Sequence, residues 1–270
     1  MTLTQSMWSG LAAPRLRREA ELVRISAIRQ LKTRYRGSTL GVFWSFANPL
    51  MMTAIYTAIF GTAFARYYDG SIARYVVSAF VGVVVVTFFQ QATTEALSSV
   101  VANGGLLNKI ELAPETFPLA AIGAHVFQQA ITTFPLLMLV SALVTRDPLR
   151  VLLVPVVLAA VVLLVVAFGV ALSAVFVFFR DAGNLWGIIG FVLWLTSPVF
   201  YPAALVPPSV RPWVMWNPVA LAISSLREVT LERGTLHGLT VAAFIGVAAV
   251  LLAAAIALFA ALRRDFIDLV

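Results

Sequence analysis

Charged residues divide this chain into six long apolar stretches, each of at least 20 residues without Asp, Glu, Lys or Arg. A helix needs about 20 apolar residues to cross the hydrocarbon core of a bilayer. Because lipid offers the backbone no hydrogen-bond partners, such stretches cross as helices. The pattern therefore predicts an all-α polytopic membrane protein with six transmembrane helices, at residues 41–65, 75–97, 117–144, 151–179, 184–201 and 239–262.

The composition agrees with this prediction, and the positions of the charged residues indicate whether the chain binds lipid headgroups or nucleic acid. Hydrophobic residues make up 61% of the chain and charged residues 11%, against roughly 45–50% and about 25% in ordinary globular domains. The formal net charge is +7, but eight of the basic residues lie within residues 15–36, before the first apolar stretch. Such a cluster favours anionic lipid headgroups over nucleic acid as the partner. The absence of cysteine excludes disulfides and thiolate metal sites.

Residues 14–36 show the pattern of an amphipathic helix that lies in the membrane interface. Apolar residues recur at spacings of three and four, and basic residues gather on the opposite side of the helix: Arg18, Arg29, Lys32 and Arg36. The alternative is a positively charged anchor that only sets topology. With both termini in the cytoplasm, the inner segments hold 12 basic residues and the outer segments hold 7. The positive-inside rule thus predicts a cytoplasmic N-terminus and a cytoplasmic tail at 263–270.

The connection at 101–116 is too polar to cross the membrane and too apolar to be a free loop. The tripeptide NGG at 103–105 is a turn signal, and Pro114 ends the segment that follows it. We expect one or two helical turns between them, on the cytoplasmic side. These turns either engage a cytoplasmic partner or rest on the lipid headgroups as a plain connector.

The connection at 202–233 contains five prolines, which exclude one continuous helix. Asn217-Pro218 marks a helix start, with Asn at the cap and Pro at the first helical position. Irregular backbone is tolerated at membrane depth only where it is packed in protein or lines a wet cavity. We therefore expect short helices that dip into the outer leaflet and form a gate, with these residues as its candidates: Pro202, Trp213, Trp216, Asn217 and Pro218.

The first apolar stretch is rich in aromatic residues and contains the pair Asn48-Pro49. Either Pro49 lies within a kinked helix, or Asn48 caps a helix that starts at Pro49. The aromatic side chains form an interfacial belt or, alternatively, a stacking surface for sugar rings. A second set of polar residues either binds sugar hydroxyls or joins helices by hydrogen bonds: Gln90, Gln91, Thr93, Thr94, Gln128 and Gln129.

Residues suited to chemistry within the membrane are sparse. His125 and His237 are the only histidines and have no partner at ligand spacing, and Glu95 is expected to be a solvated end group. No GxxxxGK[ST] motif is present, so the chain has no P-loop of its own for ATP. We expect this chain to be neither an enzyme nor a proton-driven carrier, and to bind no cofactor or metal.

Five strings along the chain resemble one family of membrane proteins. They are LKTRYRGSTLGVFWSFANPLM (31–51), LLNKIELAPETFPLA (106–120), FFRDAGNLWGI (178–188), SPVFYP (197–202) and WNPVALAISSLRE (216–228). In this order they resemble the permease subunits of ABC-type polysaccharide and polyol-phosphate exporters, the O-antigen, capsule and teichoic-acid export class. The resemblance covers nearly the full length, with the same six-span layout.

The resemblance implies a homodimer in the cytoplasmic (inner) membrane that associates with two copies of a separate ATPase, which holds ATP and Mg²⁺. The substrate would be a lipid-linked polysaccharide of the O-antigen, galactan, capsule or teichoic-acid type. Coupling to the ATPase would fall to Leu107, Lys109, Ile110, Glu111 and Pro114, and the glycan path to Phe43, Trp44, Tyr56, Trp186, Trp194 and Tyr201. Two alternatives remain: a permease of the same fold that exports a drug or small lipid, and an intramembrane enzyme.

Overall fold

The computed structural model describes residues 43–107, 113–231 and 238–263, several positions between 21 and 41, and residue 266. All regular elements of this described part are helices, which confirms the predicted all-α class. Two members of the predicted interface helix, Arg18 and Lys32, lie outside the described residues. The other two, Arg29 and Arg36, are described and exposed.

The described helices follow one another with short connections. Their bounds are α2 (Phe43–Ala65), α3 (Ile72–Ala102), α4 (Gly104–Leu107), α5 (Thr116–Ile131), α6 (Thr133–Thr145), α7 (Pro148–Phe178), α8 (Ala182–Thr196), a 3-10 turn (Ala203–Leu205), α9 (Arg211–Met215), α10 (Pro218–Thr230) and α11 (Leu239–Leu262).

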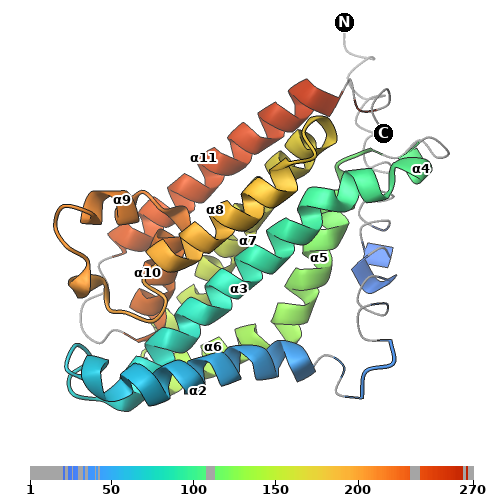
Figure 1. The fold of residues 1–270 in the computed structure, drawn as a ribbon. Coiled ribbons are helices and arrows are strands. Elements are labelled where there is room, and N and C mark those ends of the chain that lie inside the picture. Colours follow the sequence, from blue (N-terminus) through green and yellow to red (C-terminus); the bar gives the residue numbers. More distant parts are fainter. Residues whose placement is uncertain are drawn as a thin grey trace, which may run out of the picture.

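Helices α3 and α7 form the centre of the bundle (Figure 1). Helices α2 and α5 pack against α3, whereas α11 packs along α7. The main core joins α3, α7 and α10 through residues such as Phe88, Leu164 and Ile223, all buried. Because lipid tails are as apolar as these side chains, close van der Waals packing holds such helices together rather than exclusion from water.

Three helices are long and apolar enough to cross a membrane: α3, α7 and α11. Helices α5 and α6 together are also long and apolar enough for a fourth crossing if they form one span, and they are bent by 41° between Ile131 and Thr133. The sequence predicted one straight helix over 117–144, and the structure corrects this. Pro135 lies in the first turn of α6, where its missing N–H is tolerated, whereas a continuous helix would leave the Ile131 carbonyl without its partner.

The remaining two predicted spans are helical but less suited to cross. Helix α2 has 23 residues and includes Pro49, so the helix runs through the proline instead of starting there. Thr53 accordingly donates its hydroxyl to the Pro49 carbonyl at 2.8 Å. Helix α8 has 15 residues, fewer than the about 20 that a straight crossing requires. The count of six spans therefore stays a prediction.

Different helices lie at the two ends of the bundle. At one end lie α4, the C-terminal ends of α7 and α11, and the start of α8; at the other lie α9 and α10 (Figure 1). At the α4 end, the Arg263 guanidinium lies 3.4 Å from the Glu115 carboxylate. The described parts of the two segments that the sequence assigned to one side, 101–107 with 113–116 and the start of the tail, thus lie at the same end.

The α10 end is closed by tight packing of the 197–201 segment onto α3. A Cβ added at Gly82 would lie 2.8 Å from the carbonyl oxygen of Val199 and 2.9 Å from its Cα. The backbone of Val199 therefore approaches α3 as closely as a glycine allows. The Tyr75 hydroxyl donates to the Phe200 carbonyl at 3.0 Å and holds the same segment in place.

We predict that Gly82→Ala lowers the thermal unfolding temperature of the purified protein in detergent. The new methyl group meets backbone atoms that cannot rotate away, and overpacking of this kind costs about 1–3 kcal/mol. Gly246→Ala is the matched control, since a Cβ at Gly246 meets no atom within 4 Å. Equal unfolding temperatures for the two variants would contradict the close approach.

Candidate functional site

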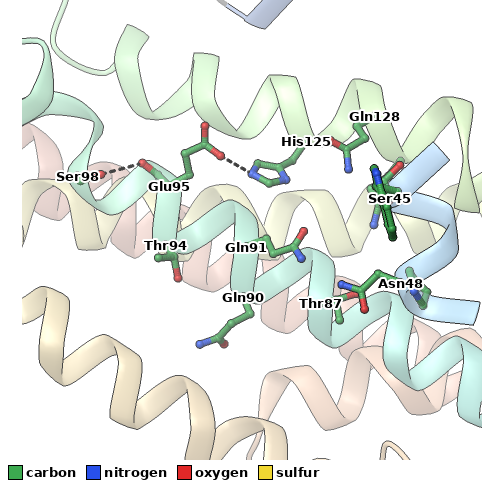
Figure 2. Close-up of a pocket in the computed structure, with 13 residues that line it drawn as sticks. Ser45, Asn48, Thr87, Gln90, Gln91, Thr94, Glu95, Ser98, His125 and Gln128 are labelled. Atoms are coloured by element: carbon green, nitrogen blue, oxygen red, sulfur yellow. Dashed lines mark hydrogen bonds and ion pairs between the residues drawn. The ribbon is translucent and has the colours of Figure 1, made fainter. Parts of the chain in front are cut away.

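A polar cavity of about 700 Å³ lies between α2, α3 and α5 (Figure 2). Most of its lining side chains end in an amide, a hydroxyl or a carboxylate. Lining residues come from all three helices: Trp44, Ser45, Asn48, Pro49, Thr87, Gln90, Gln91, Thr94, Glu95, Ser98, His125, Gln128 and Gln129. We call it the polar cavity.

Two further cavities continue the polar cavity, and the second of them is lined by α2, α8 and the segment that follows α8. A middle cavity of about 350 Å³ shares Asn48, Thr87, Gln90 and Gln91 with it. An aromatic cavity of about 310 Å³ shares Trp194 and Phe200 with the middle one. The three cavities form a row along the bundle, in which the lining changes from amides and hydroxyls to aromatic rings.

The spacing of polar residues on α3 explains the part of the lining that this helix contributes. Thr87, Gln91, Thr94 and Ser98 recur at intervals of three and four, which places them on one face of a helix. In Figure 2, Gln91 and Glu95 lie on the side of α3 toward α5, whereas Gln90 points away from His125. The Gln90 amide occupies the place where a Cβ of Gly190 would stand, so the glycine on α8 makes room for it.

A Glu95–His125 pair joins α3 to α5 at the edge of the polar cavity. The His125 Nε2 lies 2.7 Å from Glu95 Oε2, across 30 residues of sequence. His125 is buried, and the Glu95 side chain is about one-third exposed. The sequence had not indicated that these two residues meet. The polar spacing on α3 was the signal that could have found the pair.

The predicted glycan-path residues divide into two groups. Trp44 lines the polar cavity, Trp194 the middle cavity, and Tyr56, Trp194 and Tyr201 the aromatic cavity. Tyr56 stacks on Phe200 with ring centroids 3.4 Å apart. The other group lies elsewhere: Phe43 is exposed beside Phe46, and Trp186 is buried.

Trp186 is buried for a reason that periodicity could not indicate. Its ring packs near Phe89 of α3 and Phe168 of α7, with centroids 5.9 Å from each. A sequence pattern gives the face of a helix on which a residue lies, but not the neighbour that this face meets. Trp186 lines none of the three cavities.

Two buried arginines hold α10 in place at its end of the bundle. Arg227 donates to the Ser78 carbonyl at 3.0 and 3.2 Å and to the Val199 carbonyl at 2.9 Å. Arg150, 1% exposed, donates to the Glu228 carbonyl and lies 3.4 Å from Asp147. Burial of a charged group costs free energy unless the group is hydrogen-bonded. These bonds therefore hold α10 against α3 and α7.

The predicted gate residues lie in the segment that leads into α10 and at its first turn. Asn217 caps this helix by accepting from the Val219 and Ala220 amides, and Pro218 is its first residue, as the sequence predicted. The Asn217 amide also donates to the Ser197 hydroxyl at 2.9 Å. Pro202 is buried. Trp213 and Trp216 are 78% and 86% exposed, a position typical of interface anchors.

The predicted coupling residues are described only in part. Leu107 ends α4, and Pro114 lies in the turn before α5. Lys109, Ile110 and Glu111 lie outside the described residues. Within the described part of the chain, no three His, Cys, Asp or Glu side chains gather as a metal site would require.

We predict that Glu95→Ala and His125→Ala are not additive in unfolding free energy. Either change removes the same contact, so the double variant should lose about 0.5–3 kcal/mol less than the sum. Chemical unfolding in detergent measures the difference. Glu115→Ala combined with His125→Ala is the control and should be additive, because Glu115 contacts Arg263 instead. Full additivity of the Glu95 and His125 changes would argue against a stabilising pair.

Comparison with known proteins identifies the family. A model described as "ABC-2 type transporter" matches residues 21–231. The O-antigen export system permease protein RfbA of Klebsiella pneumoniae is 26% identical over 222 residues, which cover 80% of this chain and 82% of the relative. RfbA of Myxococcus xanthus is 25% identical over 243 residues, which cover 89% and 92%.

A capsule export protein is similar to this chain over a comparable range. The capsule polysaccharide export inner-membrane protein CtrC of Neisseria meningitidis serogroup A is 24% identical over 196 residues, which cover 71% of this chain and 72% of the relative. The family match spans most of the chain, from before α2 to the end of α10. This chain belongs to the ABC-2 type transporter family.

Proposed function

We propose that the chain is the membrane-spanning permease subunit of an ATP-driven exporter of a lipid-linked polysaccharide. The observation that carries the proposal is the row of three cavities that share lining residues, polar at one end and aromatic at the other. The names of the relatives support the substrate class, since they are O-antigen and capsule polysaccharide export proteins. They favour this substrate over a drug or small lipid.

The chemistry of the row suits a glycan. Sugar rings offer hydroxyls around their edge, which amides and hydroxyls bind, and C–H faces, which aromatic rings cover. The polar cavity supplies the first kind of contact and the aromatic cavity the second. A conduit needs many weak contacts rather than one tight site, because binding must be weak enough to let each sugar leave.

Movement requires an energy source that this sequence does not encode, since it has no P-loop. We therefore assign ATP hydrolysis to a separate partner, with two copies docked on the α4 end of a homodimer. Residues 107–114 would engage the partner, and residues 14–36 would lie in the cytoplasmic interface. This orientation sets both termini in the cytoplasm and α9 and α10 at the outer face.

A conduit that carries sugars must also be closed between transport events, or ions would leak. The bonds that Arg227 of α10 makes to the Ser78 and Val199 carbonyls, and that Arg150 makes to the Glu228 carbonyl of α10, suit such a closure, because they hold a short helix in place at this end of the bundle. We propose that residues 202–233 form the outer gate and that substrate pushes α10 aside.

Co-purification tests the ATPase partner. We expect the tagged chain, expressed with its genomic neighbours and solubilised in mild detergent, to retain an ATPase subunit in equal amount. A Lys109→Glu, Pro114→Ala double variant should lose the partner, because it changes charge and backbone in the coupling segment. Pro208→Ala, at the opposite end, is the control and should retain it. An oligomer without any ATPase would overturn the proposal.

Blocking the polar cavity tests the path. Thr94 is exposed and lines the cavity, so Thr94→Trp should fill it without disturbing the core. We expect polysaccharide at the cell surface to fall at least about tenfold while the ATPase complex stays intact. Leu143→Trp, on an exposed apolar face of α6, is the control. Normal export by Thr94→Trp would show that the glycan takes another route.

A further inference from the structure

One aromatic side chain beyond the last helix is buried in the protein. Phe266 follows the end of α11 at Leu262 and is 0% exposed. Its ring centroid lies 5.3 Å from that of Phe259, in the last turn of α11, and 5.9 Å from that of Phe178, the last residue of α7. Phe266 therefore packs against the C-terminal ends of both helices.

Phe266 belongs to a second hydrophobic cluster, which is distinct from the main core and lies at the α4 end of the bundle. Helices α3, α7 and α11 contribute its other buried members: Val100, Val170, Ala174, Val177 and Phe259. Val101 of α3 and Leu119 of α5 are partly buried and pack against it. The cluster thus joins the ends of four helices.

This cluster lies on both sides of the segment proposed for coupling, residues 107–114. Val100 and Val101 are in the last turn of α3, directly before α4, and Leu119 is in the first turn of α5. Helix ends fray unless side-chain packing holds them, because packing supplies most of the stability of a helix in a protein. The cluster around Phe266 therefore holds the two helix ends between which the coupling segment runs.

A second contact at this end is weaker. The Arg263 guanidinium lies 3.4 Å from the Glu115 carboxylate, and both side chains are partly exposed. Solvent-exposed ion pairs contribute little to stability, whereas an aromatic ring that is fully removed from water contributes substantially. We therefore expect Phe266, more than Arg263, to determine how firmly the end of α3 is held.

The end of α3 also leads directly to the polar cavity. Glu95 and Ser98, which line this cavity, lie within the last two turns of α3 before Val100. A rigid helix carries a displacement from its end to the side chains along its length. A force on residues 107–114 reaches the cavity wall by this route only while the last turn of α3 does not bend or fray.

We infer that Phe266 is a positioning residue for coupling. It holds the last turn of α3 against α7 and α11, so that movement of the coupling segment is passed to the wall of the polar cavity. The inference rests on the proposed function for its ATPase partner, and it extends the coupling machinery from residues 107–114 to a residue close to the C-terminus. Phe266 needs no contact with the ATPase or the glycan for this role.

Distance measurements test the anchoring on the full chain in lipid nanodiscs, without an ATPase. Because the chain has no cysteine, spin labels can be attached at Ala102→Cys, an exposed position at the end of α3, and at Gly187→Cys in α8, where a Cβ meets no atom within 4 Å. We expect Phe266→Ala to broaden the distance distribution at least about twofold. Phe266→Leu and Phe266→Val should give intermediate widths in that order, because each removes part of the buried apolar volume.

Phe244→Ala is the matched control for lost packing. Phe244 is also on α11 and 0% exposed, but it belongs to the main core. Both alanine variants should lower the thermal unfolding temperature, whereas only Phe266→Ala should broaden the distances. The wild-type width throughout the Phe266 series, or equal broadening by Phe244→Ala, would overturn the anchoring. The series keeps the test decisive even if Phe266→Ala does not accumulate.

The amount of polysaccharide exported per ATP hydrolysed tests the coupling. In cells, Phe266→Ala should retain the ATPase subunit and its hydrolysis, while polysaccharide at the cell surface falls at least about tenfold. Phe266→Leu should restore most of the export, and Phe244→Ala should change hydrolysis and export in proportion. Normal export by Phe266→Ala would overturn the coupling role.

Failure of the proposed function would give a different result. A wild-type chain that retains no ATPase fails the co-purification test, and the coupling role of Phe266 fails with it, whatever the distances show. A wild-type chain that retains its ATPase, together with normal export by Phe266→Ala, leaves the exporter proposal intact and removes only the role of Phe266.

Discussion

The buried guanidinium of Arg227 is the interaction on which the closed end of this molecule depends. A charged group in a medium with few water molecules must be surrounded by acceptors, or its burial costs several kcal/mol. Arg227 meets this demand with the carbonyls of Ser78 and Val199, which belong to two different segments. One side chain thereby ties α3, the 197–201 segment and α10 together. Helix α10, with 13 residues, is too short to be held by a full crossing of the bilayer.

The polar residues that line the row of cavities also need hydrogen-bond partners. Polar side chains inside a membrane protein are costly unless they bond to one another or to water. The residues around the polar cavity bond partly among themselves, as Thr133 does with Gln129 and His125 with Glu95. The rest of the lining surrounds about 700 Å³ of space, where water or a polar ligand could supply the remaining hydrogen bonds. Burial of these polar groups costs free energy, but the same groups suit the conduit proposed above because they can bind sugar hydroxyls.

Local signals in the sequence predicted much of the architecture. Charge-free stretches located the long helices, and Asn217-Pro218 located the start of α10 because capping is a contact between near neighbours. Long-range contacts were not accessible in this way. Arg227 and Ser78 are 149 residues apart, and no local pattern indicates that they meet. For the same reason the sequence did not indicate that His125 meets Glu95 or that Trp186 packs against Phe89 and Phe168. The bend between α5 and α6 was missed because apolar composition alone does not distinguish a straight helix from a broken one.

The exposed ion pair between Arg263 and Glu115 has a mechanical consequence. Glu115 begins the turn into α5, and Arg263 caps the C-terminal end of α11. At its other end α11 contacts α10, where the Ser225 hydroxyl donates to the Thr240 carbonyl at 3.2 Å. Helix α11, with 24 residues, thus contacts the turn before α5, next to the segment proposed for coupling, at one end and the helix proposed as the gate at the other. It joins these two parts of the molecule without lining any of the three cavities. Because the ion pair is solvent-exposed, it contributes about 1 kcal/mol or less, so α11 separates from the turn before α5 at little cost.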